Sequence, residues 1–149
     1  MELEGKRCAI EPFSITQAQV KTSFDVRSLT DIFQGELSKR LSEKGLSIQE
    51  SHPSVKQQEI TVRGQFIQID EGDRWLRWFS SFLAGKTIIE VEGKLFLGDI
   101  HVTDLYAKAT QAWGVFLGGN SQRLLKICAR IAAKKVSKQI IKALKRAIG

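Results

Sequence analysis

Apolar and polar positions alternate most regularly in the middle of the chain. From Thr87 to Leu97 every second residue is apolar or small, and Glu90 and Glu92 occupy the intervening positions, which is the two-residue period of a half-buried strand. The pair Gly98-Asp99 then favours a tight turn, and Ile100 to Thr110 continues as a second strand. The pattern predicts an antiparallel hairpin.

Three other segments have shorter strand-like patterns. Lys6 to Phe13 is a short apolar run that ends near a proline, which cannot donate to a sheet ladder. Leu46 to Glu50 is a brief extended segment. Between Ile60 and Ile69 the apolar alternation changes phase, and a bulge near Gly64 or Gln65 would account for the change.

Two segments have the three- and four-residue apolar spacing of amphipathic helices. The first follows Ser28, which forms with Asp31 the Ser-x-x-acid pattern of a capping box, and it ends at Gly45. The second begins at Asn120 or Ser121, both good N-cap residues. The expected apolar positions are Leu29, Ile32, Phe33, Leu37 and Leu41 in the first helix and Leu124, Cys128, Ile131, Val136, Ile140 and Leu144 in the second.

These elements predict one α+β domain over residues 1–149. We expect two layers, with a mostly antiparallel sheet of four or five strands packed against the two long helices. The content of 42% hydrophobic and 26% charged residues is that of a folded globular chain. No apolar run approaches the roughly 20 residues of a membrane-spanning helix.

The net charge of +7 belongs to the last helix. The first 120 residues carry 14 basic and 16 acidic side chains, whereas residues 121–149 carry nine basic and none acidic. Three interpretations of this basic stripe stay open: a solvated face, a site for nucleic-acid phosphates, and a contact with an anionic membrane surface. The absence of aromatic residues from this helix argues against nucleic acid. The stripe comprises Arg123, Lys126, Arg130, Lys134, Lys138, Lys142 and Lys145.

Residues that commonly carry chemistry are few and scattered. Cys8 and Cys128 lie far apart and have no His or Cys at metal-ligand spacing, so we interpret both as buried apolar residues that are able to pair only in an oxidising compartment. His52 and His101 have no nucleophile or second histidine placed beside them. We therefore expect no enzymatic activity, no metal and no cofactor.

The segment after the third strand has two clusters, and each has two interpretations. Asp70, Glu71 and Asp73 lie beside two arginines, which suggests an acid-base site, a cation site or, as we prefer, a capped turn with local ion pairs. Trp75 and Trp78 begin an aromatic stripe that continues through Phe79 and Phe82. Such a stripe is either core or an exposed anchor for a partner.

This segment resembles the bacterial domain-of-unknown-function family 4410. The family has a Gly-Asn/Asp-Arg element, a second arginine three residues on, a small-residue turn before a strand, and a later glycine pair. Ser81 to Gly85 departs from the GFGAG-like turn of the family. The front half bears a fainter similarity to periplasmic lipoprotein domains of the curli-secretion and TolB N-terminal type. The matching residues are Gly72, Asp73, Arg74, Arg77, Ala84, Gly85, Gly118 and Gly119.

The resemblance implies a bacterial cell-envelope protein without a recognised activity. On this basis we expect a non-catalytic accessory or assembly module that acts through contacts with unidentified protein partners in the envelope, with its oligomeric state left open. We expect it in the periplasm, lipid-anchored at the outer membrane in a longer form; a native N-terminus at Met1, which has no signal pattern, would instead mean the cytoplasm. The candidate interaction surface is Arg74, Trp75, Arg77 and Trp78.

Overall fold

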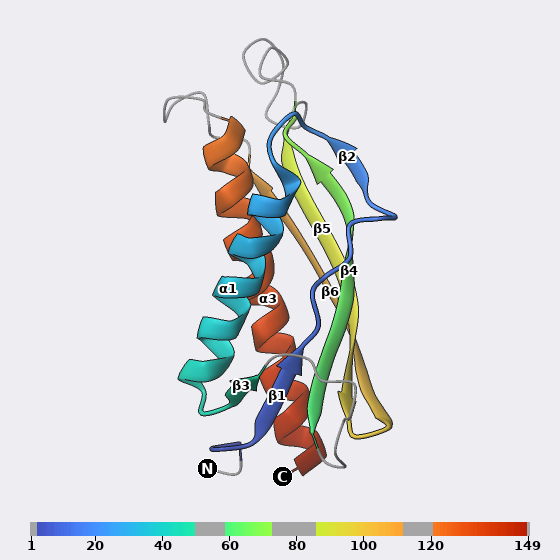
Figure 1. The fold of residues 1–149 in the computed structure, drawn as a ribbon, viewed down its shortest axis with the longest axis vertical. Helices are drawn as coiled ribbons and strands as arrows, with labels where there is room; N and C mark the ends of the chain where they lie inside the picture. Colours follow the sequence, from blue (N-terminus) through green and yellow to red (C-terminus); the bar gives the residue numbers. More distant parts are fainter. Residues whose placement is uncertain (1–2, 50–58, 73–85, 112–120, 149) are drawn as a thin grey trace.

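The computed structural model describes residues 3–49, 59–72, 86–111 and 121–148. In this part of the chain a six-stranded sheet packs against two helices (Figure 1). The α+β class and the two-layer packing predicted from the sequence are confirmed. The elements are β1 (Arg7–Ile10), β2 (Gln19–Lys21), α1 (Val26–Glu43), β3 (Ser47–Gln49), β4 (Ile60–Asp70), β5 (Thr87–Leu97), β6 (Ile100–Gln111) and α3 (Ser121–Ile148).

The sheet has six strands, where four or five were expected; its long strands pair antiparallel, as expected, but its short strands pair in parallel, so the sheet is mixed. Its order is β3-β1-β4-β5-β6, and β2 pairs with β4 beyond the end of β1. β1 is parallel to β3 and to β4, and β2 is parallel to β4, whereas β4, β5 and β6 are antiparallel. The chain passes through α1 between β1 and β3, and such a crossover returns the second strand in the same direction.

The predicted hairpin of β5 and β6 is confirmed. Its register runs from the Thr87–Gln111 pair to the Leu97–Ile100 pair beside the turn. Gly98 has a φ of 61° in that turn, a conformation that glycine adopts without a steric penalty. A local hairpin of alternating residues is therefore well encoded by its own sequence.

The bulge in β4 lies between Phe66 and Gln68, and not near Gly64 or Gln65 as predicted. Gly64 instead stays in regular register, where a Cβ would lie 2.3 Å from the ring of Phe13. Glycine is required at that position because an aromatic ring packs directly on the strand backbone.

Helix α1 begins earlier than its sequence pattern predicts. Asp25 is the N-cap, and its Oδ1 accepts a hydrogen bond of 3.0 Å from the backbone N–H of Arg27. Ser28, the predicted cap, lies inside the helix and donates its hydroxyl to Asp25 Oδ2. Aspartate is as good a cap as serine, so the chain uses the carboxylate that comes first. At the other end Gly45 has a φ of 98°, as predicted for a helix stop.

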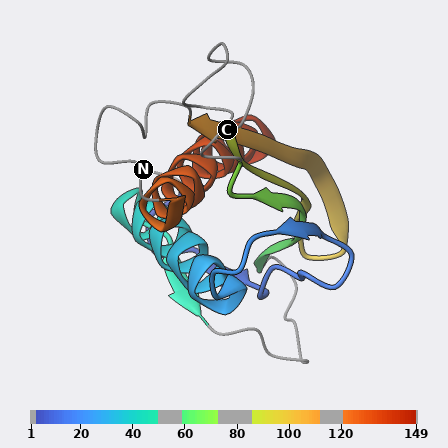
Figure 2. The same cartoon turned by 90° about the horizontal axis from the view of Figure 1, so that it is seen from above.

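The core lies between the sheet and the two helices. An aromatic cluster fills one part of it, with ring centroids of Phe33 4.7 Å from those of Phe13 and 5.3 Å from those of Phe66. Seen from above, α1 and α3 lie side by side against the curved sheet (Figure 2). The predicted apolar positions of α1 are buried except Ile32, which is half-buried.

Candidate functional site

Helix α3 has a four-residue repeat that separates a buried stripe from a basic one. Four residues of an α-helix turn through about 40° more than one full turn. Residues at four-residue spacing therefore form a stripe that winds slowly around the helix, and the buried and basic stripes wind together on opposite sides. The buried stripe is wider than predicted and includes several alanines, while Ile131 is only half-buried. It comprises Leu124, Leu125, Cys128, Ala129, Ala132, Ala133, Val136, Ser137, Ile140, Ile141 and Leu144.

The predicted basic residues lie on the solvent side of α3. All seven are exposed except Lys126, which is half-buried with its ammonium 5.7 Å from the ring centroid of Phe24. At the centre of the stripe Arg130, Lys134, Lys138 and Lys142 follow the four-residue repeat. The packing of α3 on the sheet and on α1 therefore presents these charges along one surface.

The basic charge of α3 is not balanced by acids around it. The helix carries nine basic side chains, whereas the other described residues carry eleven basic and thirteen acidic side chains. Among the described residues, no carboxylate lies within 4.0 Å of a cation of α3. The described part of the molecule thus divides into a strongly basic helix and a slightly acidic remainder.

Helices α1 and α3 lie side by side (Figure 1). Side chains from their C-terminal halves line a groove. The groove has a volume of about 500 Å³. Two of its cations come from the end of α1 and three come from α3, so it is lined by five cations and one acid. We call it the basic groove; its lining residues are Arg40, Glu43, Lys44, Ser137, Lys138, Ile141, Lys142 and Lys145.

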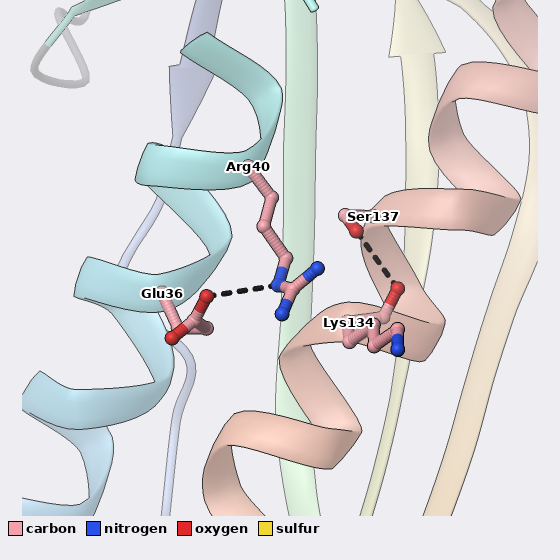
Figure 3. A network of polar contacts seen from close by, with 4 residues as sticks. All are labelled: Glu36, Arg40, Lys134 and Ser137. Atoms are coloured by element: carbon pink, nitrogen blue, oxygen red, sulfur yellow. Dashed lines mark hydrogen bonds and ion pairs between the residues drawn. The ribbon is translucent and has the colours of Figure 1, made fainter. Parts of the chain in front are cut away.

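Arg40 extends from α1 into the space between the two helices (Figure 3). Its Nε donates a hydrogen bond of 2.8 Å to Glu36 Oε2, one helical turn earlier. On the facing helix the buried Ser137 donates its hydroxyl to the carbonyl of Lys134 over 2.7 Å. Arg40 is therefore paired within its own helix, and no described carboxylate lies within 4.0 Å of the lysines that line the groove.

The sequence pattern alone did not indicate that α1 contributes to a basic site. Arg40 and Lys44 are four residues apart and follow the buried Leu37 and Leu41, which places them on the flank of the apolar face. This spacing was the available signal. Nothing in it shows that the flank lies beside α3, because that arrangement depends on how the two helices pack.

The proposed interaction surface of Arg74, Trp75, Arg77 and Trp78 lies outside the described residues, as do Asp73, Phe79, Phe82 and His52. The residues just before it include the expected turn at Gly72, whereas the expected cap at Asp73 and the ion pairs of the arginines lie outside the described residues. Asp70 Oδ1 accepts a hydrogen bond of 2.8 Å from the N–H of Gly72, whose φ is 76°. The carboxylate of Glu71 accepts from the hydroxyl of Thr22.

The described histidine and cysteines have structural surroundings. His101 Nε2 lies 2.9 Å from Asp104 Oδ1 on the surface of the hairpin. Cys8 and Cys128 are buried free thiols, and burial raises the pKa of each to about 12. Within the described ranges, no three His, Cys, Asp or Glu side chains are grouped to hold a metal ion.

A second hollow of about 540 Å³ lies on the outer face of the sheet. Its charges largely cancel, because Arg63 and Lys94 stand beside Glu92 and Asp104. Gln65 donates a hydrogen bond of 2.7 Å to Glu92. The basic groove is therefore the hollow with the stronger net charge.

Comparisons with known proteins identify a family and a fold. The model of the domain of unknown function DUF4410 matches residues 9–124. The comparison with curated proteins found no match. No helix in the described ranges has the length and apolar content needed to cross a membrane.

Several solved structures have a similar fold at low sequence identity. A Xanthomonas campestris protein of the DUF330 family is 8% identical, with a TM-score of 0.61 over 98% of this chain and 89% of that one. A hypothetical protein from Chlamydia trachomatis is 12% identical, with a TM-score of 0.58 over 97% and 98%. PelC from Paraburkholderia phytofirmans, solved as a dodecamer, is 14% identical, with a TM-score of 0.55 over 89% and 87%.

Proposed function

The chain belongs to the DUF4410 family, and we propose that it is a non-catalytic module of the bacterial cell envelope that acts through protein contacts. The observation that carries the proposal is the state of its two thiols, which are the strongest nucleophiles in the described part of the chain. A catalytic thiol needs a lowered pKa and access to solvent, whereas burial raises both of these to about 12. Both cysteine side chains therefore contribute to the packing of the core.

Several other polar side chains also have structural partners. Asp25 caps α1, Thr87 donates to the carbonyl of Glu71, and the hydroxyl of Tyr106 pairs with Glu90. Groups held in this way position the backbone and the surface, so shape and contact are the means of action that these residues support.

The open edge of the sheet at β6 is partly covered by α3. Gln139 accepts a hydrogen bond of 2.9 Å from the backbone N–H of Tyr106 and donates one to its carbonyl. Lys135 donates to the carbonyl of Lys108 over 2.8 Å. Because side chains already occupy these edge groups, we propose that partners bind through side-chain surfaces and not by adding a strand at this edge.

The fold is compatible with assembly, since PelC has the same fold and forms a dodecamer. For this chain we propose Arg74, Trp75, Arg77 and Trp78 as the partner surface. Tryptophan and arginine are the residues that most often dominate the binding energy of protein interfaces.

The test is a pull-down from envelope extract with the Arg77→Ala Trp78→Ala double variant. We expect a discrete partner to be retained by the wild-type chain and lost by the variant. The matched control is Tyr106→Ala Lys108→Ala, which also removes one aromatic residue and one cation but lies on β6. If the Arg77 and Trp78 variant keeps every partner, that surface is wrong.

A further inference from the structure

We propose that the basic groove between α1 and α3 binds the phosphate groups of an anionic phospholipid membrane. This site shares no residue with the proposed protein-contact surface, and the two proposals are tested by different substitutions. The groove brings together Lys44 of α1 and Lys138, Lys142 and Lys145 of α3 around one hollow of about 500 Å³.

The cations of the groove exceed the acids that can neutralise them. Glu43 lines the groove, and Glu36 pairs with Arg40. Five cations then face two carboxylates, and no described carboxylate lies within 4.0 Å of the four lysines. A concave site with an excess of one charge concentrates ions of the opposite charge.

Stabilisation of the helices accounts for only part of this charge. Cations in the last turn of a helix interact favourably with its macrodipole, and Arg40, Lys145 and Arg146 are in the last turns of their helices. Lys138 and Lys142 precede the last turn of α3, where the dipole effect has largely fallen off. They repel one another at four-residue spacing, so their presence on one face has a cost for the helix.

An extended anionic surface fits this arrangement better than a nucleic acid does. The basic stripe continues from the groove along α3, a helix of 28 residues that spans about 42 Å. The remainder of the described molecule is slightly acidic, and this separation of charge orients the helical face toward a negatively charged plane. Each lysine near an anionic bilayer contributes about 1 kcal/mol to binding.

Recognition of bases would need groups that α3 does not have. Single-stranded nucleic acid is held by aromatic side chains on which the bases stack. Helix α3 contains no Phe, Tyr or Trp. The surface of α3 can therefore contact phosphate groups but has no aromatic side chain on which bases could stack.

Co-sedimentation with vesicles tests the groove. The vesicles contain equal parts of phosphatidylglycerol and phosphatidylcholine, with pure phosphatidylcholine as the neutral reference. The groove variant is Lys44→Gln Lys142→Gln. The matched control is Lys21→Gln Lys94→Gln, which also removes two exposed cations, but from strands β2 and β5 and not from the basic stripe or the lining of the groove.

We expect the wild-type chain to bind the anionic vesicles and not the neutral ones. The groove variant should bind about 30-fold more weakly, the loss expected for two lysines at the surface. The control should lose less than about threefold, because its charges lie on the sheet and not on the helical face that contacts the membrane, and salt screens exposed charges that are not in contact. Circular dichroism verifies that both variants fold, and Lys138→Gln alone, with an expected loss of about fivefold, gives a second measurement.

Four results would overturn the assignment. They are equal losses in the groove variant and the control, equal binding to neutral vesicles, and tighter binding to a short DNA duplex than to the anionic vesicles in the same buffer. The fourth is displacement from vesicles by inorganic phosphate at constant ionic strength, which would identify a free anion as the ligand.

Discussion

Cys8 and Cys128 show at the scale of single residues how burial decides chemistry. Each thiol is fully enclosed in the core, and its pKa rises from 9.0 to about 12 because the thiolate would lose its hydration. In native protein at mildly alkaline pH we expect neither thiol to react with a thiol reagent within the time in which the unfolded chain reacts completely. Rapid labelling of the native protein would contradict this.

The raised pKa values also predict how stability depends on pH. Below pH 9 the thiols are protonated in both the folded and the unfolded chain. Between pH 9 and pH 12 the unfolded chain loses these protons while the folded chain keeps them, so the free energy of unfolding falls by about 1.4 kcal/mol per pH unit for each thiol.

Denaturant unfolding across this pH range measures the effect. The Cys8→Ala Cys128→Ala variant should be less stable below pH 9, since it leaves cavities in the core, but its stability should fall less steeply above pH 9. A slope equal to that of the wild-type chain would show that the thiols do not contribute.

Substitutions at Asp25 and Ser28 distinguish between two possible N-cap residues of α1. Because Asp25 caps the helix, Asp25→Ala should lower the free energy of unfolding by about 1 kcal/mol. Ser28→Ala removes only an exposed hydrogen bond to that carboxylate and should cost about 0.5 kcal/mol or less. The opposite order, measured by urea unfolding, would restore Ser28 as the cap.

At the scale of elements, Gly35 of α1 and Gly64 of β4 differ in the space available for a side chain. Gly35 lies within α1 with open space where a Cβ would be, whereas a Cβ on Gly64 of β4 would lie 2.3 Å from the Phe13 ring and 2.6 Å from the carbonyl oxygen of Glu92. Gly35→Ala should stabilise the protein by about 0.5–1 kcal/mol, and Gly64→Ala should destabilise it by about 1–3 kcal/mol.

Thermal and denaturant unfolding of the two variants measures both changes in stability. Stabilisation by alanine at Gly64 would mean that the ring of Phe13 does not pack on β4. A loss of stability at Gly35 would mean that this face of α1 is covered and not open.

The elements were predictable from the sequence where their pairing is local. The β5–β6 hairpin and α1 have strong periodic patterns and nearby partners. The parallel pairing of β1 with β3 and β4 was not predictable, because it depends on the path of the chain through α1. Strand β2 was missed because its three residues, Gln19, Val20 and Lys21, are all exposed and carry no alternation.

At the scale of the whole molecule the same limit applies to the candidate site. The basic stripe was visible in the sequence because all of its cations belong to one helix, α3. The groove was not, because Lys44 joins Lys138 and Lys142 only after two helices far apart in the chain have packed side by side. The surface from Arg74 to Trp78 stays a prediction, since it lies outside the described residues.

The proposed function makes the molecule a contact module whose basic helical face and partner surface serve different ligands. These two roles are separable by substitution. The groove variant Lys44→Gln Lys142→Gln should keep the protein partner, and Arg77→Ala Trp78→Ala should keep vesicle binding. Loss of both activities in either properly folded variant would show that the two surfaces are one.

An envelope location is the claim on which the proposed function depends most. Its direct measurement is fractionation of bacteria that express the complete native gene, followed by detection of the protein in the envelope and cytosolic fractions. We expect the protein in the envelope fraction together with its partner. Recovery of all of it in the cytosolic fraction, at low as well as high ionic strength, would contradict the proposed function.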